Sequence, residues 1–274
     1  MLIVDAQVHI WAADTPERPW PKRATAQREI PLGAEELLGA MNAAGIDRAI
    51  IVPPSWEGER NDLALAAAQA HPSRFAIMGR IDPLAPASRG LLARWRAQPG
   101  MLGLRFALRQ QKELLTGGHL EWVWSAAQDY GVPLYVLAAH EYMHLLDDVA
   151  QRFPRLRLVI DHMGLTRPVG DEIAFRDYDK VLALARHPNV AAKISALPCY
   201  SSESYPCRKL HPYIRMAYDA FGPRRLFWGT DISRSPLSYR QNVTLFTEEL
   251  PWLNGADLER VMGRGICEWL GWKI

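Results

Sequence analysis

The sequence lacks the features that mark several large classes of protein. Cysteine is scarce, with three residues in 274 and no C-x-x-C spacing, so neither a disulfide framework nor a thiolate zinc site is indicated. No apolar run approaches the roughly 20 residues that a membrane-spanning helix needs. The first residues show no basic segment leading into an apolar core and a small-residue cleavage site. We therefore expect a soluble globular protein of the reducing cytoplasm.

A dominant charge is also missing. Lysine and arginine total 32 and aspartate and glutamate total 30, and the basic residues are scattered rather than clustered. This balance gives no electrostatic reason to expect nucleic acid or an anionic membrane as a partner. The expected partner is a small-molecule substrate, and a homo-oligomer remains compatible with the sequence.

The sequence does contain a repeated alternation of short apolar runs and helical segments. The runs lack the polar alternation of half-exposed strands, which is typical of parallel strands buried on both faces. They cover residues 2–4, 49–52, 75–81, 102–106, 134–138, 156–160, 190–194 and 226–228. The helical segments cover residues 34–44, 61–71, 88–97, 120–130, 142–153, 178–186, 210–221 and 240–250.

Eight such pairs predict an α/β protein with the (β/α)8 TIM-barrel fold. A chain of 274 residues is an ordinary length for this barrel, and no linker divides it, so we expect a single domain over residues 1–274. A doubly wound open sheet is the alternative that alternation alone leaves open.

Two loops are long and aromatic. Residues 11–31 follow the first predicted strand and include Trp11 and Trp20, and residues 197–210 follow the seventh and include Tyr200 and Tyr205. Barrels of this kind place their chemistry in loops on the C-terminal side of the strands. Trp11 and Tyr200 are therefore candidate contacts for a ring-shaped ligand, although aromatic residues also pack loops together.

Polar side chains stand at the ends of most predicted strands, where the barrel would bring them to one mouth. Arginine at such a place can hold a carboxylate with two hydrogen bonds. The candidates, in chain order, are Gln7, His9, Arg105, His140, His162, Lys193 and Asp231.

Each candidate also has a purely structural interpretation. His9 could be a hydrogen-bonded core histidine, and Asp231 in a Gly-Thr-Asp turn could cap a helix. His140 could simply begin the next helix, and Lys193 could be the structural partner of a barrel carboxylate. The remaining histidines, which are His71, His119, His144, His187 and His211, are expected at the surface. Convergence at one mouth favours the functional interpretation for His9, His162 and Asp231.

Six segments together resemble the amidohydrolase superfamily, specifically the amidohydrolase-2 group of sugar lactonases, pyrone-dicarboxylate lactonase and related decarboxylases. Each segment is a weak signal, but their common order along nearly the whole chain is specific. They are residues 5–11 (DAQVHIW), 45–49 (GIDRA), 103–106 (GLRF), 154–164 (PRLRLVIDHMG), 189–197 (NVAAKISAL) and 225–231 (RLFWGTD).

The resemblance implies a metal-binding His-x-His pair on the first strand, and here the first member is Gln7. An amide oxygen is a poor Zn²⁺ ligand beside imidazole. We therefore expect catalysis without a cofactor. If a metal is bound, it should be one divalent ion, Zn²⁺ or Mn²⁺, on His9, His162 (or His140) and Asp231.

The activity that the resemblance implies is hydrolysis of a small carboxylated or sugar-derived lactone. Asp231 would be the general base for water, and His9 and His162, helped by Gln7, would donate hydrogen bonds to the developing oxyanion. Arg105, with Arg208 or Arg234 from the rims, would hold a carboxylate or hydroxyl groups. A carboxylate base titrates near about 4, so activity should fall in acid.

Two other functions stay open from the sequence. The same strand ends could serve a metal-dependent decarboxylase or lyase acting on an aromatic or dienoic acid, which metal analysis would reveal. The barrel could also be a binding protein without catalysis, with Gln7 as a sign of the lost chemistry. Screening a panel of lactones would separate that case from a lactonase.

Overall fold

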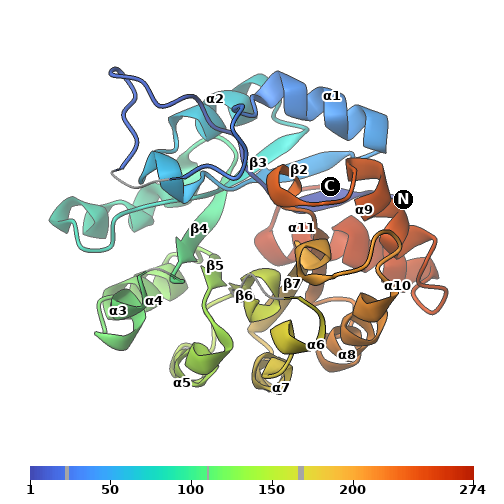
Figure 1. Ribbon diagram of the computed structural model, residues 1–274. Helices are drawn as coiled ribbons and strands as arrows, with labels where there is room; N and C mark the ends of the chain where they lie inside the picture. The colour runs from blue at the N-terminus through green and yellow to red at the C-terminus, as the bar shows by residue number, and fades with distance from the viewer. Residues whose placement is uncertain (22–24, 110, 166–169) are drawn as a thin grey trace.

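The computed structural model describes residues 1–21, 25–109, 111–165 and 170–274. Its centre is an eight-stranded parallel sheet in the order β1 to β8, which Figure 1 shows with the helices around it. The strands are β1 (Val4–Val8), β2 (Arg48–Ile51), β3 (Phe75–Gly79), β4 (Met101–Ala107), β5 (Leu134–Leu137), β6 (Leu158–Ile160), β7 (Val190–Ser195) and β8 (Leu226–Gly229). Each apolar run predicted as a strand overlaps an observed strand, although the run at residues 2–4 shares only Val4 with β1.

The sheet curves until β1 and β8 meet, and polar contacts join them. The backbone N–H of Asp231 donates to the carbonyl of Gln7 at 2.9 Å. The buried carboxylate of Asp5 accepts hydrogen bonds from Thr230 and from Tyr239. A sequential strand order with joined ends defines a (β/α)8 barrel, and it excludes the doubly wound sheet, whose strand order reverses at a switch point.

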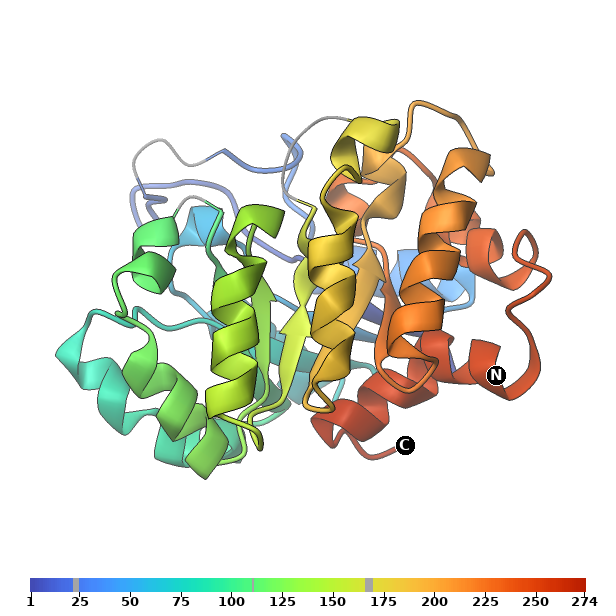
Figure 2. The ribbon, with the colours of Figure 1, turned by 90° about the horizontal axis from the view of Figure 1, so that it is seen from below.

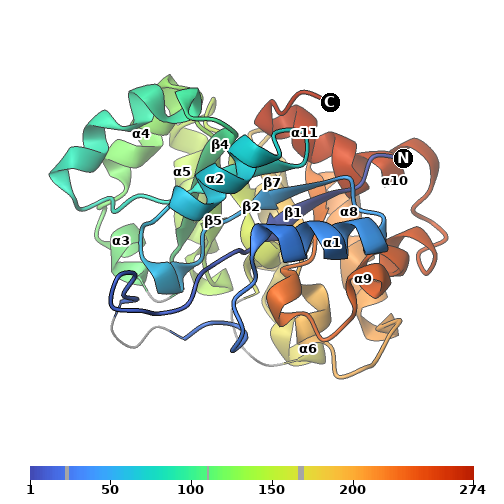
Figure 3. The same cartoon turned by 90° about the horizontal axis from the view of Figure 1, so that it is seen from above.

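Helices cover the outside of the strands (Figure 3). None of those in the described ranges is long and apolar enough to cross a membrane. They are α1 (Ala34–Ala44), α2 (Asp62–Ala70), α3 (Lys112–Thr116), α4 (Glu121–Asp129), α5 (Met143–Arg152), α6 (Asp171–Ala174), α7 (Tyr178–Leu182), α8 (His211–Phe221), α9 (Tyr239–Thr247), α10 (Gly255–Glu259) and α11 (Gly265–Leu270).

The predicted helices differ from the observed ones mainly where the chain has helix breakers. Residues 34–44 match α1, and Gly45 ends that helix in the left-handed conformation (φ 77°). Residues 88–97, predicted as one helix, instead lie in two short 3-10 helices, Pro86–Gly90 and Leu92–Ala97. Gly90 within the segment and Pro86 just before it disfavour a continuous α-helix.

The lower end of the barrel is closed by the C-terminal helix. Ile266, Cys267 and Leu270 of α11 pack in one cluster with Val4 of β1 and Phe227 of β8. This helix lies beyond the last segment predicted from the sequence. In Figure 2 the loops that follow the strands gather at the opposite end from α11. The upper end is therefore the only end of the described barrel where strand-tip side chains can form a site.

Strand β1 contains an irregularity that determines which way its polar side chains point. Asp5 pairs with Ala49 and Val8 pairs with Ile51, so β1 has one residue more than β2 over this stretch. Such a β-bulge interrupts the alternation of faces. As a result Ala6 lies in the apolar interior, and the next residue, Gln7, also contacts the interior through Lys193.

Candidate active site at the C-terminal ends of the strands

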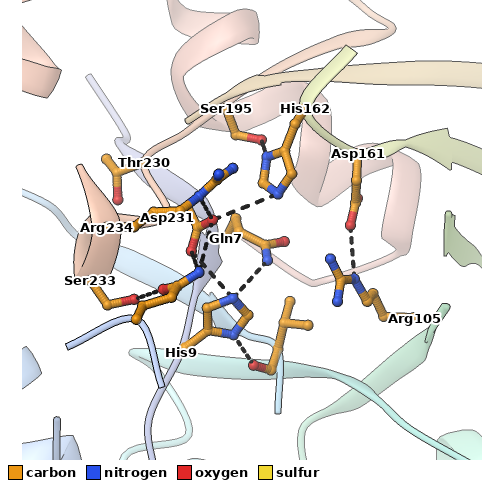
Figure 4. Close-up of polar contacts among 12 residues, drawn as sticks. Gln7, His9, Arg105, Asp161, His162, Ser195, Thr230, Asp231, Ser233 and Arg234 are labelled. Carbon is orange, nitrogen blue, oxygen red and sulfur yellow. Dashed lines mark hydrogen bonds and ion pairs between the residues drawn. The ribbon is translucent and has the colours of Figure 1, made fainter. Parts of the chain in front are cut away.

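Four residues predicted from the sequence meet at the barrel mouth (Figure 4). His9 Nε2 lies 3.2 Å from Asp231 Oδ1, and His162 Nε2 lies 3.7 Å from Asp231 Oδ2. Gln7 Nε2 lies 3.3 Å from His9 Nε2. All four side chains are almost completely buried. The predicted convergence of Gln7, His9, His162 and Asp231 is therefore present in the structure.

The orientation of Gln7 follows from its neighbour Lys193. Lysine has only donors, so the amide atom 2.5 Å from Lys193 Nζ is the oxygen Oε1. The amide nitrogen of Gln7 therefore faces His9 and donates to it. Gln7 presents hydrogens, and no free lone pair, to the centre of the site.

The tautomer of His9 is set by the backbone. Its Nδ1 lies 2.6 Å from the carbonyl oxygen of Val52, which can only accept, so Nδ1 carries a hydrogen. In the neutral ring Nε2 is then a lone pair, which accepts from Gln7. In the neutral ring His9 accepts at Nε2 and in the imidazolium form it donates there, so the expected role of His9 as a donor to substrate stays a prediction.

His162 is held neutral by its surroundings. Burial, followed by the positive charge of Arg234, lowers the pKa of His162 to about 3. Its Nδ1 lies 2.7 Å from the hydroxyl of Ser195 on β7, which can donate or accept. The backbone of His162 is left-handed (φ 52°, ψ 32°), an uncommon conformation for a residue other than glycine. Strain of this kind clusters at functional sites.

Asp231 is ionised and surrounded by donors. Burial acts to raise its pKa, but Arg234 foremost, and then His9 and His162, hold the pKa well below its ordinary value. Arg234 Nε lies 2.5 Å from Oδ2, and the amide nitrogen of Gln27 approaches both oxygens at 3.3 and 3.4 Å. Asp231 also has left-handed backbone (φ 52°).

A buried ion-pair network adjoins these residues. Asp161 lies 3.0 Å from Arg105 Nε and 2.8 Å from Lys193 Nζ, and the exposed fractions of Asp161 and Lys193 are both 0%. Burial lowers the pKa of Lys193 to about 8. Lys193 is thus the structural partner of a barrel carboxylate, as one of its two interpretations predicts, and Arg105 reaches the mouth with its Nε bonded to Asp161.

Three further candidates lie apart from the four central residues. His140 begins a 3-10 helix and bonds the carbonyl of Met163 at 2.9 Å, and the hydroxyl of Tyr200 donates to the carbonyl of Leu165 at 2.7 Å. His140 and Tyr200 line a small cavity of about 70 Å³ that none of the four central residues lines.

Trp11 packs edge-on against Trp56 with 5.2 Å between ring centres, and only 2% of it is exposed. The other predicted rim residue, Arg208, is exposed on the surface. The polar groups of His140 and Tyr200 are thus occupied by the chain, and Trp11 belongs to the core. The ring of Tyr200 lies 5.7 Å from the guanidinium of Arg234, which binds Asp231. The binding roles of His140, Tyr200 and Trp11 stay predictions.

Two residues of the site were not predicted from the sequence. Gln27 comes from the loop after β1 and reaches Asp231, while the hydroxyl of Ser233 bonds its amide oxygen. Asp161 stands beside His162 in the sequence and organises the ion-pair network. A polar residue in a long loop gives no signal of its own, but two adjacent ionisable residues at the end of β6 could have pointed to Asp161.

An ionised carboxylate and two imidazoles at the C-terminal ends of parallel barrel strands are the arrangement typical of barrel enzymes. The sequence matches the amidohydrolase family over residues 4–264. The chain therefore belongs to the amidohydrolase family.

Two curated relatives are similar along most of the chain. An L-fucono-1,5-lactonase of Burkholderia ambifaria is 28% identical over 235 residues, which is 83% of this chain and 79% of the relative. A 4-sulfomuconolactone hydrolase of Hydrogenophaga intermedia is 26% identical over 234 residues, or 83% of this chain and 73% of the relative.

Solved structures share the whole fold. A probable 2-pyrone-4,6-dicarboxylic acid hydrolase of Acinetobacter baumannii with bound citric acid has a TM-score of 0.82 at 17% identity, covering 99% of this chain and all of the other. An amidohydrolase of Burkholderia multivorans with bound zinc has the same TM-score at 21% identity, covering 99% of each chain. At these identities the likeness establishes the fold.

The donor set at the mouth does not fit a divalent metal. The amide hydrogens of Gln7 face the lone pair of His9 that a metal would need, and Arg234 already neutralises Asp231. Metal ligands must be free of hydrogens on the coordinating atom. Within the described ranges, no group of three or more His, Cys, Asp or Glu side chains is arranged to hold a metal ion.

Proposed function

We propose that this protein hydrolyses a small lactone by direct attack of water, without a metal. The observation that carries the proposal is the buried, ionised carboxylate of Asp231, with His9 and His162 at 3.2 and 3.7 Å. An ionised carboxylate in this position can take a proton from an attacking water molecule as a general base. The two curated relatives are named as lactone hydrolases, which supports the same reaction class.

The reaction then needs one proton carrier. As the water oxygen attacks the ester carbonyl carbon, Asp231 takes a proton from it, and the carbonyl oxygen becomes an oxyanion. When the ring C–O bond breaks, the protonated Asp231 returns that proton to the departing ring oxygen. The products are a carboxylic acid and a hydroxyl group on one opened chain, so atoms and charge balance. The low pKa of Asp231 makes its protonated form a strong donor for the second step.

His162 is placed to stabilise the oxyanion. The ring is neutral, and when the Ser195 hydroxyl donates to Nδ1 the proton of the ring is on Nε2, which faces the Asp231 side of the site. A neutral donor in a dry site is worth far more than one in water. Gln7 keeps His9 in its accepting form by donating to Nε2.

The proposal is tested with a panel of lactones and a pH indicator, because ring opening at neutral pH releases a proton. We expect turnover of at least one five- or six-membered lactone, dependent on enzyme concentration. Failure to open any of sugar lactones, pyrone acids and muconolactone-type acids would contradict the proposal. Release of CO₂ from an aromatic acid would favour the decarboxylase instead.

Chelation is expected to leave lactone hydrolysis unchanged, because no step passes through a metal. The measurement is kcat/KM before and after dialysis against a strong chelator, with bound zinc and manganese determined by mass spectrometry. Restored metal in the buffer provides the control. Activity that disappears on dialysis and returns with about one ion per chain would contradict metal-free catalysis.

Replacing Arg234 by methionine is expected to move the acid limb of the pH–rate profile to higher pH. Arg234 is the foremost group that keeps the pKa of Asp231 low, so without it the carboxylate becomes protonated at a higher pH. In the wild type Asp231 stays ionised at pH values well below those at which an ordinary carboxylate becomes protonated. Activity should therefore persist to lower pH than it would with a base of ordinary pKa. The exposed Arg208→Met is the matched control, and an unmoved limb in Arg234→Met would contradict the assignment of Asp231.

With this function we retain a small-molecule substrate, a cytoplasmic location and the absence of nucleic-acid and membrane partners as proposals. The single-domain organisation and the homo-oligomer stay predictions.

A further inference from the structure

Lys193 of β7 is a fully buried cation to which the proposed reaction gives no step. Its Nζ lies 2.8 Å from Asp161 Oδ1, 2.5 Å from Gln7 Oε1 and 3.4 Å from the carbonyl oxygen of Ala6. The ring centre of Tyr135 lies 3.7 Å from it on another side. An ammonium group has three hydrogens, and these three oxygens accept them. The position of the Lys193 ammonium is therefore fixed by the barrel interior.

The fixed ammonium determines which end of the Gln7 amide faces the mouth. Lysine can only donate, so the amide oxygen stays on its side, and the amide nitrogen lies 3.3 Å from His9 Nε2 (Figure 4). The other nitrogen of the His9 ring is held by the carbonyl oxygen of Val52 at 2.6 Å. In neutral His9, Nε2 accepts from Gln7, and in the imidazolium form it carries a hydrogen itself. Neither form offers a metal ion a free lone pair.

The charge of Lys193 also acts against a second cation at this place. Burial foremost lowers the pKa of Lys193, and the negative charges of Asp161 and, more weakly, of Asp231 oppose that change. The charge of Lys193 is therefore felt at Asp231, the carboxylate that a metal ion would need. Arg234 is already paired with the same carboxylate. Because like charges repel strongly in a buried site, a divalent ion would be opposed by both cations.

We propose that Lys193 keeps divalent metal ions out of the barrel mouth by holding the amide of Gln7 with its hydrogens toward His9. The inference rests on the proposed metal-free function and names the residue that enforces it. Lys193 is a positioning residue, because it acts through Gln7 and touches none of the reacting atoms. Without Lys193, the side chain at position 7 would be free to turn and present a lone pair to the mouth.

The test measures Zn²⁺ binding to the intact protein by calorimetry, with no substrate present. In Gln7→Glu one carboxylate oxygen can stay on Lys193 while the other faces His9 without a hydrogen, so Zn²⁺ should bind at least about tenfold more tightly than to the wild type. Gln7→His supplies an imidazole, which is typical of zinc sites. Its ring nitrogen beside Lys193 must accept, so the other nitrogen carries the hydrogen, and the affinity should stay near that of the wild type.

Adding Lys193→Met to Gln7→His should release the imidazole for a metal ion. The double variant should bind Zn²⁺ about 10–100-fold more tightly than Gln7→His alone, the range by which a partner that orients a ligand changes metal affinity. Adding Lys180→Met instead removes an exposed lysine from α7 and should leave the affinity of Gln7→His unchanged. Circular dichroism verifies the fold of each variant. If the double variant does not fold, the comparison of Gln7→Glu with Gln7→His decides the proposal.

The proposal is overturned if Gln7→His alone binds Zn²⁺ as tightly as the double variant, or at least as tightly as Gln7→Glu. Position 7 alone would then decide whether a metal binds. Stoichiometric binding of Zn²⁺ by the wild type would overturn it as well. Because no substrate is present in these titrations, a failure to open any lactone would remove the proposed reaction and leave the role of Lys193 intact.

Discussion

Asp231→Asn is expected to lower kcat/KM for lactone opening by about 10²–10⁴-fold, the range that a general acid–base group contributes. Asparagine has nearly the same shape, but its amide cannot take a proton from water. In the proposed reaction the same group also returns the proton to the ring oxygen, so both steps lose their carrier. The effect should therefore be on kcat rather than on KM.

The variant should stay folded, so that a loss of activity can be assigned to catalysis. Asparagine tolerates the left-handed backbone found at position 231. The guanidinium of Arg234 is 25% exposed, so it can be hydrated once its partner is neutral. Circular dichroism and thermal unfolding would verify the fold, and Asp179→Asn, an exposed substitution on α7, is the matched control. Turnover by Asp231→Asn within tenfold of the wild type would remove Asp231 from its proposed role.

Asp161→Asn should destabilise the fold more than any surface substitution. The change leaves Arg105 and Lys193 buried side by side without their shared carboxylate. Breaking a buried ion pair from one side costs about 3–5 kcal/mol in the free energy of unfolding. For a chain of this size the melting temperature should fall on the order of 10 °C. Asp219→Asn breaks an exposed pair with Arg215 and should cost less than about 1 kcal/mol.

The pH dependence and a second substitution separate charge from packing. The pKa of Lys193 is lowered in the folded state, so folding favours its neutral form and stability rises as pH increases from about 8 toward the unfolded value. The loss in Asp161→Asn should accordingly be smaller at pH 9 than at pH 6. Adding Lys193→Met should recover part of the loss. A double variant as unstable as the sum of the single ones would show that the loss is not electrostatic.

The sequence predicted those parts of the fold that depend on local pattern. Eight apolar runs are enough to define eight buried strands, and their ends place His9, His162 and Asp231 at one mouth. The observed distances between these three residues confirm the convergence, while their catalytic roles stay predictions. Strand positions were less accurate, since residues 2–4 were predicted for β1, which covers Val4–Val8. The polar residues Asp5 and Gln7 interrupt the apolar pattern from which strands were predicted. Both can lie in a buried strand because each is hydrogen-bonded inside the fold.

What could not be predicted depends on contacts between distant segments. The tautomer of His9 is fixed by the carbonyl of Val52, and the orientation of Gln7 is fixed by Lys193. The helix that closes the lower end of the barrel follows the last predicted segment, and its partners are residues of β1 and β8.

The extra residue in β1 changes which of the following side chains face the interior of the barrel. With strict alternation, the strand that puts Val4 and Ala6 inside would also put Val8 inside and turn Gln7 and His9 toward the helices. The extra residue shifts the alternation by one position, so that Val8 packs among the helices while Gln7 and His9 face the mouth. One inserted residue thus lets a single strand supply apolar packing to the lower layer of the barrel and chemistry to the upper one.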